Sequence, residues 1–126
     1  MPALRILIVE DDPDSNEALR LMLEAVNYEV RAALSARVAI ELATAHPPDL
    51  AFIDIGLPGL DGFELLTLLR SRRELMDTKF VAMTGYDFRL LPSAQVAGFD
   101  HYMLKPFGAD AILNAVSTLF PASVGT

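Results

Sequence analysis

Short apolar runs alternate with segments of helical periodicity along almost the whole chain, and this alternation limits the possible folds more than any other feature. Apolar runs that read as strands cover residues 4–9, 50–54 and 79–84, a run of alternating apolar and polar residues covers 28–33, and a short fifth strand is expected over 101–105. The segments between them carry apolar residues at every third or fourth position, which is typical of amphipathic helices. Strands that alternate with helices favour a parallel sheet whose two faces are both covered.

The segments between the strands also carry helix start and stop signals. Asp12 and Pro13 form an acidic cap with proline in the first turn, and this helix is expected to run through Val26. Ser35 is expected to cap a second helix that continues to about Ala45. Two further helices are expected over residues 63–71 and 108–119. We therefore predict an α/β fold, a doubly wound five-stranded parallel sheet of the flavodoxin-like order 2-1-3-4-5 with helices on both faces.

Length and composition indicate one domain. The 126 residues are 52% apolar, and we expect a single domain over residues 1–126, with its core in residues 4–119 and a loose tail in residues 120–126. No apolar run approaches the ~20 residues of a membrane helix, and no signal peptide is recognisable, so we expect no membrane insertion and a cytoplasmic location. The net charge of −7 argues against direct binding to nucleic acid and suits a cation or a basic partner. The absence of cysteine excludes disulfides and thiolate metal sites.

Polar residues stand where the predicted strands end. In open parallel sheets, sites form beyond the carboxyl ends of the strands, where the strand order reverses. Five side chains are expected to converge there: Glu10, Asp11, Asp54, Thr84 and Lys105. Three neighbouring carboxylates repel one another unless a cation lies between them. The sequence therefore predicts a pocket that combines an acidic cluster with one hydroxyl and one ammonium group.

The residue types in this pocket favour a particular chemistry. Mg²⁺ prefers oxygen ligands, typically one or two carboxylates together with waters and a phosphate oxygen; Mn²⁺ or Ca²⁺ are expected to substitute. Lys105 can offer a second positive charge to a phosphoryl group, and Thr84 can donate a hydrogen bond to it. Asp54 is the expected nucleophile, because carboxylates are known to form aspartyl phosphates.

These residues, together with the segments DIGLPGLDG and KPF, resemble the CheY-like receiver domain of response regulators in two-component signalling. The resemblance spans about residues 4–119. It implies that Glu10 and Asp11 are the metal-binding acid pair and that Asp54 is the phosphorylated aspartate. It further implies that the carbonyl of Gly56 completes the protein ligands of the metal. By the same resemblance, Thr84 is the switch hydroxyl, Tyr102 the switch aromatic and Lys105 the phosphate-contacting lysine, and the Lys105–Pro106 peptide bond is cis.

The resemblance implies a phosphorelay switch rather than an enzyme with a separate substrate. A histidine kinase or a phosphotransfer protein would donate the phosphoryl group from phosphohistidine, and the domain would catalyse its own phosphorylation and dephosphorylation. The new charge would draw in Thr84 and bury Tyr102, which changes the face formed by the fourth helix, fifth strand and fifth helix. Whether the chain is a stand-alone regulator or the receiver part of a hybrid histidine kinase stays open, as does its downstream partner.

Other readings compete with these. The acids at the strand ends could simply pair with surface lysines, Asp12 is interpreted as a helix cap rather than a metal ligand, and Asp61 as a helix entry. A receiver-like interaction module that signals without phosphorylation is the main alternative function. A phosphatase or phosphotransferase with an Asp nucleophile is a third, but no strand ends in an Asp-x-Asp motif.

One segment departs from the usual pattern. Pro92 cannot occupy a helix interior, so the fourth helix is expected to begin near it and to be short. Residues 86–91 would then form a loop that exposes Phe88, and Tyr86 would partly cover the pocket rim, which Gly56 leaves bare.

Overall fold

The computed structural model describes residues 3–59, 61–85 and 98–121. Five strands and four α-helices alternate along this part of the chain, with one short 3₁₀ helix, η1 (Arg73–Leu75). The strands are β1 (Arg5–Val9), β2 (Glu29–Ala33), β3 (Leu50–Asp54), β4 (Lys79–Thr84) and β5 (His101–Leu104). The α-helices are α1 (Pro13–Glu24), α2 (Ala36–Ala45), α3 (Gly62–Arg70) and α5 (Ala109–Leu119).

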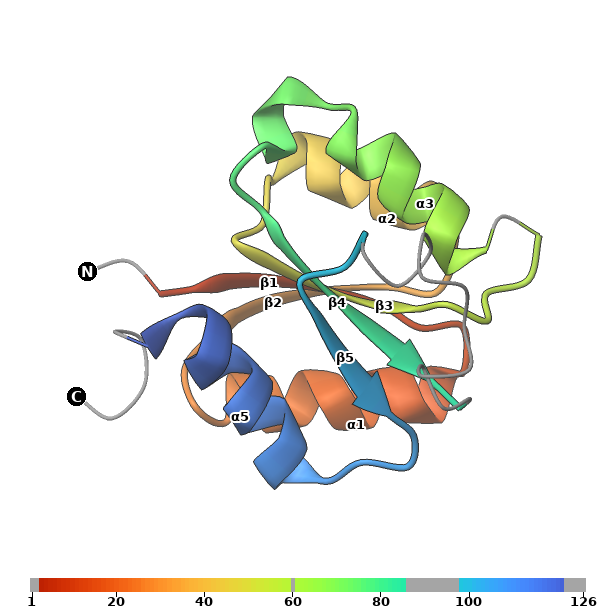
Figure 1. Ribbon diagram of the computed structural model, residues 1–126. Coiled ribbons are helices and arrows are strands. Elements are labelled where there is room, and N and C mark those ends of the chain that lie inside the picture. Colours follow the sequence, from red (N-terminus) through yellow and green to blue (C-terminus); the bar gives the residue numbers. More distant parts are fainter. Residues whose placement is uncertain (1–2, 60, 86–97, 122–126) are drawn as a thin grey trace.

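All five strands pair in parallel in the order β2-β1-β3-β4-β5, which confirms the predicted doubly wound sheet. Figure 1 shows α2 and α3 on one face of the sheet and α1 and α5 on the other. The strand order reverses between β1 and β3, because the chain first moves outward to β2 and then returns past β1. A site at the carboxyl ends of the strands is therefore expected beside β1 and β3.

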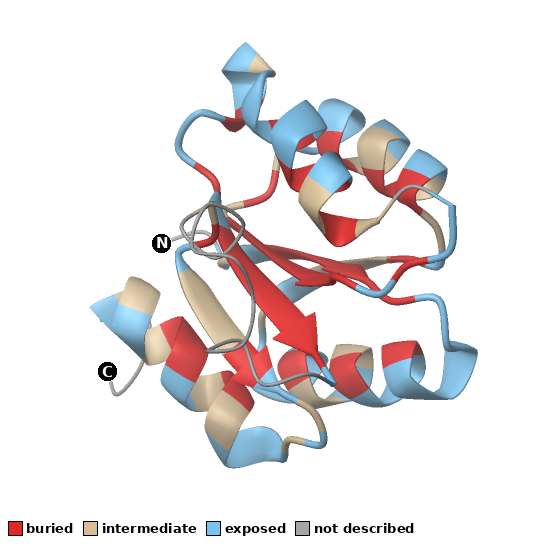
Figure 2. Ribbon diagram, turned by 45° about the vertical axis from the view of Figure 1, so that its right-hand side comes forward, coloured by how far each residue is buried: buried red, intermediate tan, exposed pale blue. Residues whose placement is uncertain are grey.

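The alternation of side chains along the central strands divides the core into two layers. Leu7 and Val9 of β1 point toward α2 and α3, whereas Ile6 and Ile8 point toward α1 and α5. Every residue of β3 is buried, as expected for a central strand covered on both sides, and Figure 2 shows the buried residues concentrated in the middle of the sheet. The central strands are therefore covered on both faces by buried apolar side chains up to their carboxyl ends.

Local capping sets the helix boundaries. The side chain of Asp12 accepts a hydrogen bond from the amide of Ser15, that of Ser35 from Val38, and Asp61 likewise caps α3. The interpretation of Asp12 as a cap is therefore confirmed. The helix expected to run through Val26 ends at Glu24 instead. Asn27 takes a left-handed backbone conformation with φ of 69°, which a right-handed helix cannot continue through.

Several sequence predictions lie outside the described residues. These are the short fourth helix near Pro92, the loop over residues 86–91 with Phe88, and the contact of Tyr86 with the pocket rim. The tail of residues 122–126 also lies outside them. Among the described residues, no helix is long and apolar enough to cross a membrane.

Candidate functional site

Three of the predicted polar residues lie together at the carboxyl ends of β1 and β3. Glu10 and Asp11 follow β1 directly, and Asp54 is the last residue of β3. Each of these three residues offers a carboxylate oxygen, and the three oxygens lie within 4.8 Å of one another. Glu10 is only 3% exposed and Asp54 only 8%, whereas Asp11 is open to solvent. The cluster thus has two buried acids, Glu10 and Asp54, and one exposed acid, Asp11.

Lys105 lies across this cluster. It follows β5, and its Nζ donates to Oε1 of Glu10 over 2.7 Å and to Oδ2 of Asp54 over 2.8 Å. Its backbone amide donates to the carbonyl of Thr84 over 2.7 Å, which extends the β4–β5 pairing beyond the end of β5 at Leu104. The strand predicted over residues 101–105 is therefore one residue shorter. One ammonium group offsets two buried carboxylates, and the site as a whole keeps an excess of negative charge.

Burial and this ion pairing shift three pKa values. Burial raises the pKa of Glu10, and the hydrogen bond from Lys105 offsets this only in part. Burial alone would raise the pKa of Asp54 too, but its hydrogen bonds, above all the one from Lys105, bring its pKa below the usual value. Burial would lower the pKa of Lys105, and the two carboxylates more than reverse that effect. Asp54 is therefore held as a carboxylate, and Lys105 as an ammonium.

The loop after β3 supports Asp54 from the other side. The backbone amide of Gly56 donates to Oδ1 of Asp54 over 2.8 Å, so both carboxylate oxygens of Asp54 have a donor. Gly62 opens α3 directly against the end of β3: a Cβ atom there would lie 2.4 Å from Cα of Ile55 and 2.8 Å from the carbonyl oxygen of Asp54. This close contact explains why the helix begins with glycine, and it fixes the loop that holds Asp54.

The turn between β1 and α1 holds the acid pair. The amide of Asp12 donates to Oε2 of Glu10 over 3.3 Å. The side-chain amide of Asn16 donates to the carbonyls of Glu10 and Ala33, each over 3.0 Å. Sequence reasoning missed Asn16. Its signal was a polar residue in phase with the buried Leu19 and Leu23 of α1, where an apolar one would be expected.

The two predicted switch residues lie on β4 and β5. Thr84 is fully buried at the end of β4, and its register partner on β5 is Leu104. Tyr102 is half-buried, and its ring packs edge-on against Phe99 at 5.8 Å between centroids. Phe99 packs in the same manner against Phe63 of α3 at 5.9 Å. The ring of Tyr102 is thereby connected through Phe99 to the first turn of α3. Burial raises the pKa of the Tyr102 hydroxyl.

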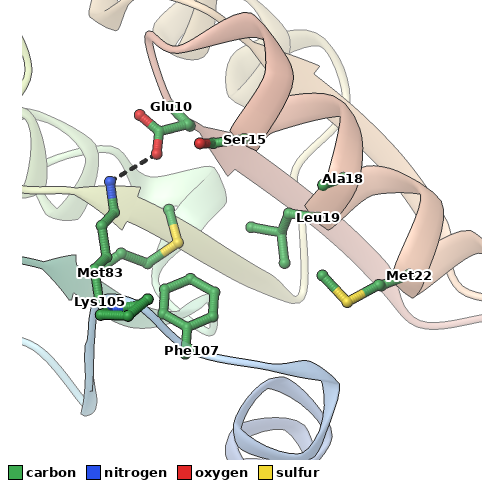
Figure 3. A pocket seen from close by; sticks show the side chains of 9 residues that line it. Glu10, Ser15, Ala18, Leu19, Met22, Met83, Lys105 and Phe107 are labelled. Carbon is green, nitrogen blue, oxygen red and sulfur yellow. Dashed lines mark hydrogen bonds and ion pairs between the residues drawn. The ribbon is translucent and has the colours of Figure 1, made fainter.

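The peptide bond between Lys105 and Pro106 is cis, as the resemblance implies. The following residues border a cavity of about 450 Å³ between α1 and the loop that leads to α5. Figure 3 shows Glu10, Ser15 and Lys105 at the polar end of this cavity, and Leu19, Met22 and Phe107 around its apolar part. The acidic cluster and an apolar hollow therefore share Glu10 and Lys105.

Comparison with known proteins agrees with this architecture. Residues 6–117 match the model of the response regulator receiver domain. The transcriptional regulatory protein KdpE of Mycobacterium tuberculosis is 34% identical over 108 residues, which are 86% of this chain and 47% of KdpE. The response regulator MprA of Mycolicibacterium vanbaalenii is 34% identical over 120 residues, which are 92% of this chain and 50% of MprA. The chain thus spans about half the length of these two relatives.

Solved structures of receiver domains share its fold. A CheY-like receiver domain from Methylobacillus flagellatus has a TM-score of 0.86 and 26% identity, covering 94% of this chain and 99% of its own. The response regulator TrrA of Thermotoga maritima, solved in complex with Mg²⁺ and BeF, has a TM-score of 0.82 and 28% identity, covering 93% of this chain and 99% of its own.

Proposed function

Because the chain belongs to the response regulator receiver domain family, we propose that it is a phosphoacceptor switch in which Asp54 receives a phosphoryl group from the phosphohistidine of a histidine kinase or a phosphotransfer protein. The observation that supports this most is the pairing of one ammonium, that of Lys105, with both Glu10 and Asp54 at the strand-order reversal. The domain is then its own catalyst, and it has no separate substrate to turn over.

The acidic cluster suits a hard divalent cation. Carboxylate oxygens of Glu10, Asp11 and Asp54 lie close enough to share one ion, and the carbonyl of Gly56 is proposed as a further ligand. Mg²⁺ is the expected ion, with Mn²⁺ or Ca²⁺ as substitutes, since all three bind oxygen ligands. When bound, Mg²⁺ would neutralise the charge on the phosphoryl oxygens and on the acids around them.

The residues of the chain would divide the transfer among them. An oxygen of Asp54 forms the new P–O bond as the P–N bond of the donor breaks, and the imidazole leaves with the electron pair. The amide of Gly56 and the ammonium of Lys105 hold the carboxylate of Asp54 in one orientation before the reaction. Lys105 then pairs with a phosphoryl oxygen in place of the consumed carboxylate charge.

Thr84 and Tyr102 are proposed to report the reaction to the surface. Thr84 ends β4, beside β3 and its terminal Asp54, where its hydroxyl could donate to the new phosphoryl group. Tyr102 is half-buried against Phe99 and its hydroxyl oxygen is already fully buried, so phosphorylation would stabilise this inward position of the ring. The face that includes β5 and α5 would change as a result, and this is a local charge change that biases a two-state element.

The apolar cavity beside the cluster supports docking of the phosphodonor. A donor protein must bring its phosphohistidine to Asp54, and the cavity wall formed by Leu19, Met22 and Phe107 offers an apolar contact beside that path.

The downstream partner is proposed to be a protein. KdpE and MprA are regulators about twice as long as this chain, and we propose no direct contact of the receiver domain with nucleic acid. We further propose that residues 1–126 act as one receiver domain in the cytoplasm.

Intact-mass measurement after incubation with acetyl phosphate tests the proposal. We expect the wild type to gain one phosphoryl group in the presence of Mg²⁺ and none in its absence. Asp54→Asn should gain none, whereas Asp61→Asn, which changes a helix cap in the same loop, should behave as the wild type. If folded wild type gains no mass with Mg²⁺, the alternative of a phosphorylation-independent interaction module is favoured.

A further inference from the structure

The geometry points to Asn16 as a positioning residue: we propose that its side-chain amide sets the orientation of the peptide that joins Glu10 to Asp11, and through it the affinity of the acid pair for Mg²⁺. This inference rests on the proposed function, because it assigns Asn16 a task in the metal site. Asn16 itself touches neither the metal nor the phosphoryl group.

The side chain of Asn16 is buried, and its amide group is hydrogen-bonded there. It is only 4% exposed, in the first turn of α1, where Leu19 and Leu23 occupy the same buried face. A buried amide is costly unless it is hydrogen-bonded. Nδ2 of Asn16 donates to two backbone carbonyls, those of Glu10 and Ala33, and each distance is 3.0 Å. The amide group therefore joins the end of β1 to the end of β2.

This bond fixes a peptide plane in the site. A peptide unit is planar, so the direction of the Glu10 carbonyl determines where the amide and Cα of Asp11 lie. The same carbonyl of Ala33 also accepts the amide of Glu10 over 3.1 Å. Glu10 is thus held on both sides of its Cα: its N–H by Ala33 and its C=O by Asn16. The backbone under the acid pair has little freedom to rotate.

Asp11 depends on this backbone more than Glu10 does. Both carboxylate oxygens of Glu10 accept hydrogen bonds, from Lys105 and from the amide of Asp12. The carboxylate of Asp11 is exposed, and within the described ranges no hydrogen bond or ion pair holds it. Its position is therefore set by the peptide that precedes it.

The affinity for Mg²⁺ depends on the position of the Asp11 carboxylate. The ion demands nearly octahedral geometry with ligands at about 2.0–2.1 Å, so small displacements of a carboxylate cost affinity. Residues that orient metal ligands typically change metal affinity by about 10–100-fold when they are removed. If Asn16 is lost, the Glu10–Asp11 peptide can rotate, and the three carboxylates no longer meet at one point.

Isothermal titration of the metal-free full chain with MgCl₂ tests this. We expect Asn16→Ala to weaken Mg²⁺ binding by about tenfold or more. Thr78→Val is the matched control: Thr78 is equally buried and its hydroxyl also donates to a backbone carbonyl, that of Pro48 over 2.7 Å, but at the opposite end of the sheet. Thr78→Val should lower the thermal stability and leave Mg²⁺ affinity unchanged.

The outcomes separate this inference from the proposed function. If the wild type binds no Mg²⁺, both fail. If the wild type binds Mg²⁺ and Asn16→Ala binds it equally well, only the role of Asn16 is refuted, and the same holds if Thr78→Val weakens binding as much as Asn16→Ala does. If Asn16→Ala does not fold, Asn16→Ser, which keeps one shorter donor, provides the comparison, and its affinity should fall between those of the wild type and a ligand-deficient Asp11→Asn variant.

Discussion

At the scale of single residues, Lys105 is the counter-ion of Glu10 and Asp54. Its ammonium contacts two carboxylates that are almost fully buried, while its own side chain is 32% exposed. A buried charge that loses its partner is strongly destabilising, because desolvation is then uncompensated. A metal ion bound to the same carboxylates would supply the missing positive charge.

Replacement of Lys105 should therefore make the protein depend on the metal. We expect Lys105→Met to lower the free energy of unfolding by roughly 2–3 kcal/mol without Mg²⁺, less than for a fully buried pair because Lys105 is partly solvated. Mg²⁺ should restore more stability to the variant than it adds to the wild type, while phosphorylation slows. Urea unfolding with and without Mg²⁺ measures this. Equal stabilisation of both proteins would contradict the counter-ion role.

The raised pKa of Glu10 predicts a pH dependence. Burial favours the protonated form of Glu10, so the proton is retained at pH values above 4.5, the ordinary value of the group. A metal ligand must lose its proton, and Mg²⁺ affinity should accordingly fall as the pH is lowered toward that range. Titration calorimetry at several pH values, in buffers of different ionisation enthalpy, counts the protons released. An affinity that stays constant down to pH 4.5 would count against a buried Glu10 ligand.

At the scale of elements, the sequence predicted the strands and the helix starts, because both depend on local patterns of residues. All five strands and the four described α-helices were expected, and Asp12, Ser35 and Asp61 mark helix starts as their chemistry requires. The extension of α1 through Val26 was wrong, because the turn at Asn27 depends on how α1 meets β2. Asn16 was missed for a similar reason: its two carbonyl partners come from different strands.

The contact between α3 and β3 provides a test at this scale. Gly62→Ala places a Cβ atom against the backbone of Ile55 and Asp54, so α3 or the Asp54 loop must move. We expect a loss of about 1–3 kcal/mol in unfolding free energy, as for other overpacked sites, and slower phosphorylation. Gly108→Ser is the control, since a Cβ at Gly108 meets no atom within 4 Å and serine is a favourable cap for α5. Equal unfolding free energies for Gly62→Ala and Gly108→Ser would contradict the close contact between α3 and β3.

At the scale of the whole molecule, the fold and the meeting of Glu10, Asp11, Asp54 and Lys105 followed from the alternation of strands and helices. The topology brings parallel strand ends to one edge, so residues at those ends must be neighbours. The pairing of Lys105 with two acids rather than one, the aromatic contacts of Phe99 and the cavity between α1 and the loop before α5 did not follow. These depend on side-chain reach and packing across elements distant in sequence.

Mg²⁺ should stabilise the whole domain by mass action. A ligand present at 100 times its dissociation constant contributes about 2.7 kcal/mol, which corresponds to a rise of roughly 10 °C in melting temperature for a domain of this size. Asp11→Asn should lose most of this rise. NaCl at equal ionic strength is the control, because the net charge of −7 makes some stabilisation by screening expected in both proteins. A rise that NaCl reproduces would mean that no specific site is occupied.

The identity of the phosphorylated residue decides whether Asp54 is the phosphoacceptor. Borohydride reduction after treatment with acetyl phosphate and Mg²⁺ converts a phosphorylated aspartate into homoserine, and tandem mass spectrometry of the peptide over residues 38–70 locates it. That peptide contains Asp49, Asp54 and Asp61, so the two other aspartates serve as internal controls. We expect homoserine at position 54 and at neither of the others. Modification at another residue, or none in protein that binds Mg²⁺, would contradict it.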